Sequence, residues 1–130
     1  MSRRKSVHIK EFKHANPIPA CSRIGNIVMS GVINGIDPAT GKVAPTLEAQ
    51  CTHMFQHMRR MVEAAGGTTD DIIKMTVWMA DRSQREALNR EWVKMFPDEA
   101  SRPARHTLRA ALDGEGGIQI QCDFMAVLAG

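Results

Sequence analysis

The side chain best suited to bind a small organic acid stands in the segment "RPARHTL", residues 102–108. Pro103 forbids a helix there, and alternation along the following strand places Arg105, Thr107 and Arg109 on one face. A planar guanidinium can donate two parallel hydrogen bonds to a carboxylate, which makes Arg105 a candidate anchor for a carboxylate ligand. The spacing alone favours a strand-end arginine that points into solvent.

Two histidines in "CTHMFQHMRRM" suggest a metal site at first, because His53 and His57 are four residues apart on one side of a helix. No third ligand follows at a recognisable spacing, so we interpret both as packing or solvated side chains and predict no metal site. Met54, Met58 and Met61 fall on the apolar stripe of the same helix. We therefore expect them to fill the core and not to form a cofactor surface.

The elements that must position these side chains follow from hydrophobic periodicity. Period-two patterns and apolar runs predict strands at 6–12, 25–33, 68–81, 104–112 and 117–127, with a tight turn at 37–41. Three- and four-residue steps predict helices at 46–65 and 83–96, the first with Thr46 as its N-cap. The connection "DGEGG" is expected to join the last two strands.

The predicted order is β-β-α-β-α-β-β, and each helix carries one apolar stripe that must cover a sheet face. This order favours a two-layer α+β domain. The runs "IVMSGVI" and "IQIQCDFMAV" carry apolar residues on both strand faces. We therefore expect a partner subunit to bury the second face of the sheet.

Composition limits the class of protein. A chain of 130 residues with 43% hydrophobic and 24% charged residues is expected to form one globular domain over residues 1–130. No apolar run approaches the roughly 20 residues that cross a bilayer, and no secretory-signal pattern is present, so we predict a cytoplasmic protein. Three widely spaced cysteines indicate reduced thiols, and a net charge of +3 without tyrosine gives little support for nucleic-acid binding.

From about residue 19 to residue 127 the chain resembles the RidA/YjgF family of small trimeric proteins, many of which hydrolyse reactive enamines and imines. Six segments carry the resemblance in the family's order: "GNIVMSG", "DPATG", "VEAAGGTTDDIIKMTVWMAD", "LNREW", "RPARHT" and "CDFMAV". The resemblance implies a chorismate-mutase-like α+β fold, with a mixed sheet covered by two helices, in a homotrimer with a central barrel. Such a trimer would hide the second face of the sheet.

The resemblance also implies a site. In the family the arginine of the "PAR" strand binds the substrate carboxylate, and this residue is Arg105 here. The implied pocket lies in the cleft between adjacent subunits, lined by Gly31 and Thr107. Asn89 of "LNREW" is expected either near the interface or as a structural helix residue.

The chain departs from the family's pattern at residues that bear on the chemistry. Typical deaminating members carry a tyrosine that helps to close the pocket, where this chain has Ala20 or Cys21. They also carry a glutamate that positions the attacking water, where this chain has Gln121. Asp123 follows on the same strand face, as a catalytic substitute or as a solvated or interface residue, and Val32 stands where glutamine is common.

The implied function is hydrolytic deamination of 2-imino acids, or of related imines, to 2-keto acids and ammonia, without a metal or organic cofactor. The catalytic residues would be Arg105, which holds the carboxylate, and Gln121, which orients water. The predicted substrate-binding residues are Gly31, Thr107, Asn89 and Cys21. Because glutamine cannot accept a proton, the alternative is a regulatory trimer that binds small carboxylates without turnover. A ribonuclease finds little support, since no histidine pair with a lysine emerges for phosphodiester chemistry.

Overall fold

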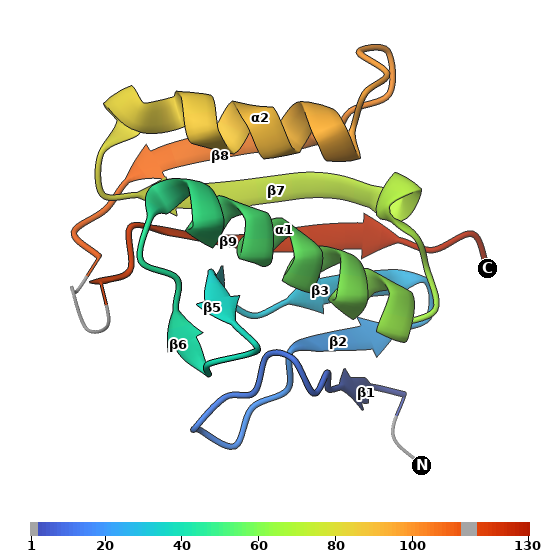
Figure 1. Ribbon diagram of the computed structural model, residues 1–130. Helices are drawn as coiled ribbons and strands as arrows, with labels where there is room; N and C mark the ends of the chain where they lie inside the picture. Colours follow the sequence, from blue (N-terminus) through green and yellow to red (C-terminus); the bar gives the residue numbers. More distant parts are fainter. Residues whose placement is uncertain (1–2, 113–116) are drawn as a thin grey trace.

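A mixed sheet with two helices on one side forms the protein, in a computed structural model that describes residues 3–112 and 117–130 (Figure 1). This confirms the predicted α+β class. The strands are β1 (Lys5–Val7), β2 (Cys21–Ile24), β3 (Ile27–Ser30), β4 (Ile33–Asn34), β5 (Ile36–Asp37), β6 (Lys42–Val43), β7 (Ile72–Met79), β8 (Ala104–Arg109) and β9 (Ile120–Val127). The helices are α1 (Leu47–Ala64) and α2 (Arg85–Met95), with short 3-10 turns η1 (Thr69–Asp71) and η2 (Arg82–Gln84).

The strand order in the main sheet is β1-β2-β3-β9-β7-β8, and β4 continues the line of β3 along β9. β7 and β8 are parallel, because α2 carries the chain back across the sheet between them. The other pairings are antiparallel. β8 therefore lies at one edge of the sheet, directly beside α2 (Figure 1).

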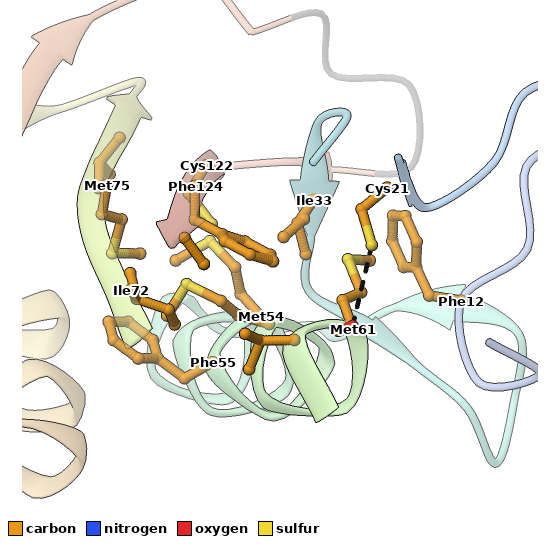
Figure 2. Packing of buried hydrophobic residues seen from close by; sticks show 14 of the residues in the cluster. Phe12, Cys21, Ile33, Met54, Phe55, Met61, Ile72, Met75, Cys122 and Phe124 are labelled. Atoms are coloured by element: carbon orange, nitrogen blue, oxygen red, sulfur yellow. Dashed lines mark hydrogen bonds between the residues drawn. The ribbon is translucent and has the colours of Figure 1, made fainter. Parts of the chain in front are cut away.

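The core lies between α1 and the sheet, as the apolar stripe predicts. Thr46 caps α1, since its side chain accepts a hydrogen bond from the backbone N–H of Ala49. Gly66 adopts a φ of 102° just after the helix, a left-handed conformation that glycine tolerates best. Figure 2 shows the stripe packed on the sheet, with these labelled core residues: Met54, Phe55, Met61, Ile33, Ile72, Met75 and Phe124.

His57 is a packing residue, in agreement with the sequence interpretation. It is fully buried, and its Nε2 donates to the carbonyl of Ile36 at 2.7 Å. Nδ1 then accepts a hydrogen bond from the guanidinium of Arg60 at 3.2 Å. The neutral imidazole can therefore make both hydrogen bonds. Burial is the main cause that lowers the pKa of His57. Within the described residues no group of three or more histidine, cysteine or acidic side chains is arranged to hold a metal ion.

Both helices lie on one side of the sheet, and no described element covers its second face, the open face (Figure 1). The strand register assigns to the open face five large hydrophobic residues that are 37% to 57% exposed: Ile24, Ile27, Met29, Leu108 and Val127. This arrangement agrees with the expected burial by a partner.

Several boundaries differ from the sequence prediction. The strand predicted at 6–12 is limited to β1, and the strands predicted at 68–81, 104–112 and 117–127 are shorter than predicted. The strand predicted at 25–33 is divided into β3 and β4, and β2 was not predicted. The second helix begins at Arg85, because residues 82–84 form the tighter η2 turn after Asp81, whose side chain caps it. The predicted "DGEGG" connection falls largely on residues 113–116, outside the described residues. Within the described part of the chain no helix has both the length and the apolar character to cross a membrane.

Candidate functional site

Arg105 stands on the helix-covered face of the edge strand. It pairs with Met75 of β7, a fully buried core residue, so the two side chains point to the same side. The guanidinium lies over the ring of Trp92 of α2, with 4.9 Å from Cζ to the ring centroid. Such a cation–π contact is worth about 0.5–2 kcal/mol and fixes the orientation of the arginine. Arg105 is therefore held against the flank of α2 and is not a free surface charge.

The guanidinium of Arg105 retains hydrogen-bonding capacity. Its Nη1 is buried and has no hydrogen-bond partner among the described residues. A buried donor without a partner costs about 1–3 kcal/mol, so an acceptor at this position is stabilising. Burial lowers the pKa of Arg105, and the nearby positive charge of Arg85 lowers it further. Both observations favour an anion at this guanidinium.

Thr107 and Asn89 lie on the same flank. Thr107 pairs with Val77, on the same face as Arg105 and two residues along β8. Asn89 is exposed on α2, three residues before Trp92, and so projects from the same side of the helix. The name Arg105 flank is used below for the surface made by Arg85, Asn89, Trp92, Arg105 and Thr107.

Gln121 lies on the opposite face of the sheet. It pairs with Trp78 of β7 and with Asn34 of β4, and all three side chains point to the open face. Gln121 and Asp123 share this face, as alternation predicts. Gln121 does not approach Arg105 within a single chain, because β7 lies between the two strands and the side chains point in opposite directions.

Asp123 has a partner on the open face. It pairs with Thr76 of β7, and the backbone and side chain of that threonine donate hydrogen bonds that favour the charged carboxylate. Burial outweighs these bonds and raises the pKa of Asp123. The carboxylate is only partly buried, which leaves it accessible to a neighbouring copy.

Gly31 lies at the break between β3 and β4, the two strands that pair in succession with β9. Its backbone N–H donates to the carbonyl of Ala20 at 2.9 Å, which places Ala20 beside it. Asn34, at the other end of the break, has a buried Oδ1 without a hydrogen-bond partner among the described residues. The name Gln121 face is used below for Gly31, Asn34, Gln121 and Asp123, the residues at and beside this break.

The predicted role of Cys21 in ligand binding is not supported. Its side chain is 1% exposed and points into the core, where Sγ contacts the carbonyl oxygen of Met61 at 3.8 Å as a weak donor (Figure 2). Burial raises the pKa of the thiol to about 11. The preceding residue, Ala20, is also buried, and its methyl group offers no polar atom in place of a tyrosine hydroxyl.

A hollow of about 450 Å³ lies among residues 8–20, away from Arg105 and Gln121. Its lining is mostly apolar and includes Phe12, Ile18 and Ala20, with Lys10 and His14 at its polar positions. One chain therefore supplies the two candidate halves of a site, the Arg105 flank and the Gln121 face, without joining them in one cavity.

Two residues of the Arg105 flank were missed as site residues. Trp92 is only partly buried, and its ring contacts both Phe96 and the guanidinium of Arg105. Arg85 was not singled out. The sequence pattern that could have identified both residues is their spacing. Asn89 and Trp92 follow Arg85 by four and seven residues, so the three side chains share one side of a helix.

Known proteins resemble this chain in sequence and in fold. A family model described as Endoribonuclease L-PSP matches residues 9–127. The chain is 31% identical over 101 residues to a RutC family protein of Haemophilus influenzae, covering 75% of this chain and 78% of that protein. It is 32% identical over 89 residues to 2-iminobutanoate/2-iminopropanoate deaminase of Salmonella typhimurium, covering 68% and 70%. A crystal structure of TdcF from E. coli with bound serine has a TM-score of 0.86 at 22% identity, covering 96% of this chain and 99% of that one.

Proposed function

Since the chain belongs to the RidA/YjgF family, whose family model bears the description Endoribonuclease L-PSP, we propose that it hydrolyses 2-imino acids to 2-keto acids and ammonia. The observation that carries the proposal is the state of Arg105. Its guanidinium is held by Trp92 and has a buried Nη1 without a partner among the described residues. The relative named as an imine deaminase supports the same chemistry.

Arg105 binds the substrate carboxylate in this proposal. The guanidinium donates two parallel hydrogen bonds, and such a charged hydrogen-bonding group contributes about 1.5–3 kcal/mol to binding. Thr107 shares the strand face of Arg105, and Asn89 lies on the same side of α2 as Trp92, so these two residues contact the rest of a small substrate in this proposal. The serine bound in TdcF is a small molecule with a carboxylate, which supports a ligand of this size.

The site is completed by a second copy. We propose a homotrimer, in which neighbouring copies bury the open apolar face of each sheet. In this assembly the Arg105 flank of one copy faces the Gln121 face of the next. The proposal is supported by the exposed hydrophobic residues of the open face and by the separation of Arg105 and Gln121 within one chain.

The reaction is an addition followed by an elimination. Water adds to the imine carbon, the electrons of the C=N bond move to the nitrogen, and protonation gives a tetrahedral carbinolamine. Loss of ammonia then regenerates a carbonyl group, so that imine plus water becomes keto acid plus ammonia. Gln121 orients the water through its amide oxygen but cannot take its proton. General-base assistance is typically worth about 10²- to 10⁴-fold, so we expect slow turnover.

The glutamine at position 121 also favours a second function, ligand binding without turnover. Glutamine at position 121 and alanine at position 20 leave a pocket that can hold a carboxylate without a base or a hydroxyl. Such a protein would be a trimer that binds small carboxylates as a regulator and does not turn them over. The Arg105 flank would serve both functions in the same way.

A coupled assay separates the two functions. An amino-acid oxidase or a dehydratase generates 2-imino acids in the cuvette, and their decay is followed with and without this protein. Faster decay that disappears in Arg105→Ala supports the deaminase. Decay at the spontaneous rate, together with calorimetric binding of 2-ketobutyrate that requires Arg105, supports the regulatory trimer and overturns the enzyme.

A further inference from the structure

Arg85 is the second cation of the Arg105 flank. It is the first residue of α2, and Asn89 and Trp92 follow it at four and seven residues, so the three side chains lie on one side of the helix. Trp92 contacts the guanidinium of Arg105, which fixes that side of α2 against β8. The Arg85 side chain therefore projects from the same flank that holds the proposed carboxylate anchor.

The charge of Arg85 is not neutralised by the described residues. Within residues 3–112 and 117–130 the ion pairs are His53 with Asp37, Arg60 with Glu11 and Lys94 with Glu91, none of them on this flank. Arg85 is exposed. Its positive charge reaches Arg105, as the lowered pKa of Arg105 indicates after the larger effect of burial.

The acidic groups at this end of α2 are Glu86, which follows Arg85 on another side of the helix, and Asp81, which has other partners. Asp81 precedes η2, and its carboxylate accepts hydrogen bonds from the backbone and side chain of Ser83 and from the side chain of Gln84. Those bonds, with a smaller effect of Arg109, lower the pKa of Asp81. Arg109 faces the same side of β8 as Arg105. The Arg105 flank itself therefore carries two positive charges, Arg85 and Arg105, with Arg109 next to it on β8.

One monocarboxylate can neutralise only one of the guanidiniums. A ligand with a second anionic group relieves the remaining repulsion between Arg85 and Arg105, because each guanidinium then has its own carboxylate. The amide of Asn89, one helical turn after Arg85, can donate to the same second group. A ligand of this kind uses the positive charge of the whole flank.

We infer that Arg85 binds a second carboxylate, and that the preferred ligands of this site are 2-keto and 2-imino dicarboxylic acids. This rests on the proposed function, in which Arg105 anchors the first carboxylate. Arg85 then determines which acids the site selects, while Arg105 determines that it binds acids at all.

The test is calorimetric binding to the full-length protein at low salt. The probes are 2-ketobutyrate as the monocarboxylate and oxaloacetate and 2-ketoglutarate as dicarboxylates of two lengths. We expect at least one dicarboxylate to bind about tenfold or more tightly than 2-ketobutyrate, which corresponds to about 1.4 kcal/mol. Arg85→Gln should bring this ratio near one, and Arg85→Lys, which keeps the charge, should restore most of it.

The matched control is Arg90→Gln, which removes the same charge from an exposed position of α2 that faces away from the flank. It should retain the dicarboxylate preference. The inference is overturned if the wild-type protein shows no preference, or if Arg85→Gln and Arg90→Gln reduce it equally. If Arg105→Ala leaves all three affinities unchanged, the proposed function fails as well. If Arg105→Ala abolishes binding and Arg85→Gln leaves the ratio of dicarboxylate to monocarboxylate affinity unchanged, the inference about Arg85 is overturned and the proposed function stands.

Discussion

Arg105 and Gln121 point to opposite faces of the same sheet, with β7 between their strands. Arg105 points to the helix side because it pairs in register with the buried Met75, and its guanidinium then lies over the ring of Trp92, 4.9 Å from the ring centroid. Gln121 points to the open face beside Trp78. One chain therefore cannot present both side chains to one small substrate, and a site that uses both depends on assembly.

The first prediction tests that dependence with Met29→Lys. Met29 is 57% exposed on the open face, so a lysine there leaves the single chain folded but places a charge in the proposed subunit contact. We expect light scattering to give a mass near 14.4 kDa for the variant and near three times that value for the wild type, and calorimetry to show no binding of 2-ketobutyrate by the variant.

Ala39→Lys is the control, because it adds the same charge at the exposed turn between β5 and β6. It should assemble and bind like the wild-type protein. A Met29→Lys monomer that binds 2-ketobutyrate normally would show that one chain contains the whole site.

The second prediction concerns Arg105→Ala. Loss of a charged hydrogen-bonding group that contributes about 1.5–3 kcal/mol should weaken binding of 2-keto acids by about 10- to 150-fold. The fold should persist, because the guanidinium is only partly buried and its main internal contact is Trp92. Calorimetry and circular dichroism measure the two effects, with Arg90→Ala as a control on the exposed side of α2. If Arg105→Ala binds 2-keto acids with unchanged affinity, Arg105 does not anchor the ligand.

Alternation within a strand could be predicted from the sequence, and it correctly grouped Gln121 with Asp123 and Arg105 with Thr107. The apolar stripe and the Thr46 cap likewise predicted α1 closely, because helix packing and capping are local properties. The register between strands is not local. β7 separates β8 from β9 only because the parallel crossover through α2 places it there, so the opposite orientation of Arg105 and Gln121 could not be read from either segment.

The same reason explains why Arg85 was not singled out and why the inward orientation of Cys21 was not predicted. A helix flank becomes part of a site only when the strand beside it is known, and the position of β8 at the sheet edge depends on the whole strand order. Cys21 lies in the short strand β2, which has too few residues to show a period, so its inward orientation was not predictable.

The third prediction follows from the burial of the cysteines. Burial raises the pKa of Cys21 to about 11 and that of Cys51 to about 12, and it also raises the pKa of Cys122. Reaction with a disulfide reagent requires an accessible thiolate. The native protein should therefore release almost no thionitrobenzoate from Ellman's reagent at pH 8, whereas the denatured chain should release the equivalent of its 3 thiols. Rapid labelling of a native thiol that is absent in Cys21→Ser would place Cys21 back among the site residues.

The fourth prediction is a pH dependence of stability from His57. Burial lowers the pKa of His57 below its ordinary 6.5, so the unfolded chain takes up a proton at a higher pH than the folded chain. The stability that the neutral ring contributes is present above pH 6.5 and is lost as the pH falls toward the folded pKa. The free energy of unfolding should decrease by up to about 1.4 kcal/mol per pH unit from this group.

Urea unfolding at pH 7.5 and pH 5.5 isolates the effect with His57→Gln, whose amide can donate to the carbonyl of Ile36 but does not titrate. The wild-type protein should lose more stability than the variant between the two pH values. His106→Gln, at an exposed position of β8, should behave like the wild type. Equal losses in the wild-type protein and His57→Gln would show that His57 does not control this dependence.

The last prediction is that Gln121→Glu increases imine hydrolysis. A carboxylate at position 121 can orient the attacking water and also accept its proton, which the amide cannot do. Partial burial on the Gln121 face and the neighbouring Asp123, whose own pKa is raised mainly by burial, should raise the pKa of the new glutamate, while Arg105 of the adjacent copy should lower it. We expect a gain of about tenfold or more in kcat, below the full general-base range because Ala20 provides no hydroxyl.

The variant should also acquire an acidic limb in its pH–rate profile, and Gln56→Glu, on the exposed side of α1, should change neither quantity. If Gln121→Glu leaves the rate unchanged or lowers it while Arg105→Ala still removes activity, glutamine serves a different substrate and the assignment as an imine deaminase must be withdrawn.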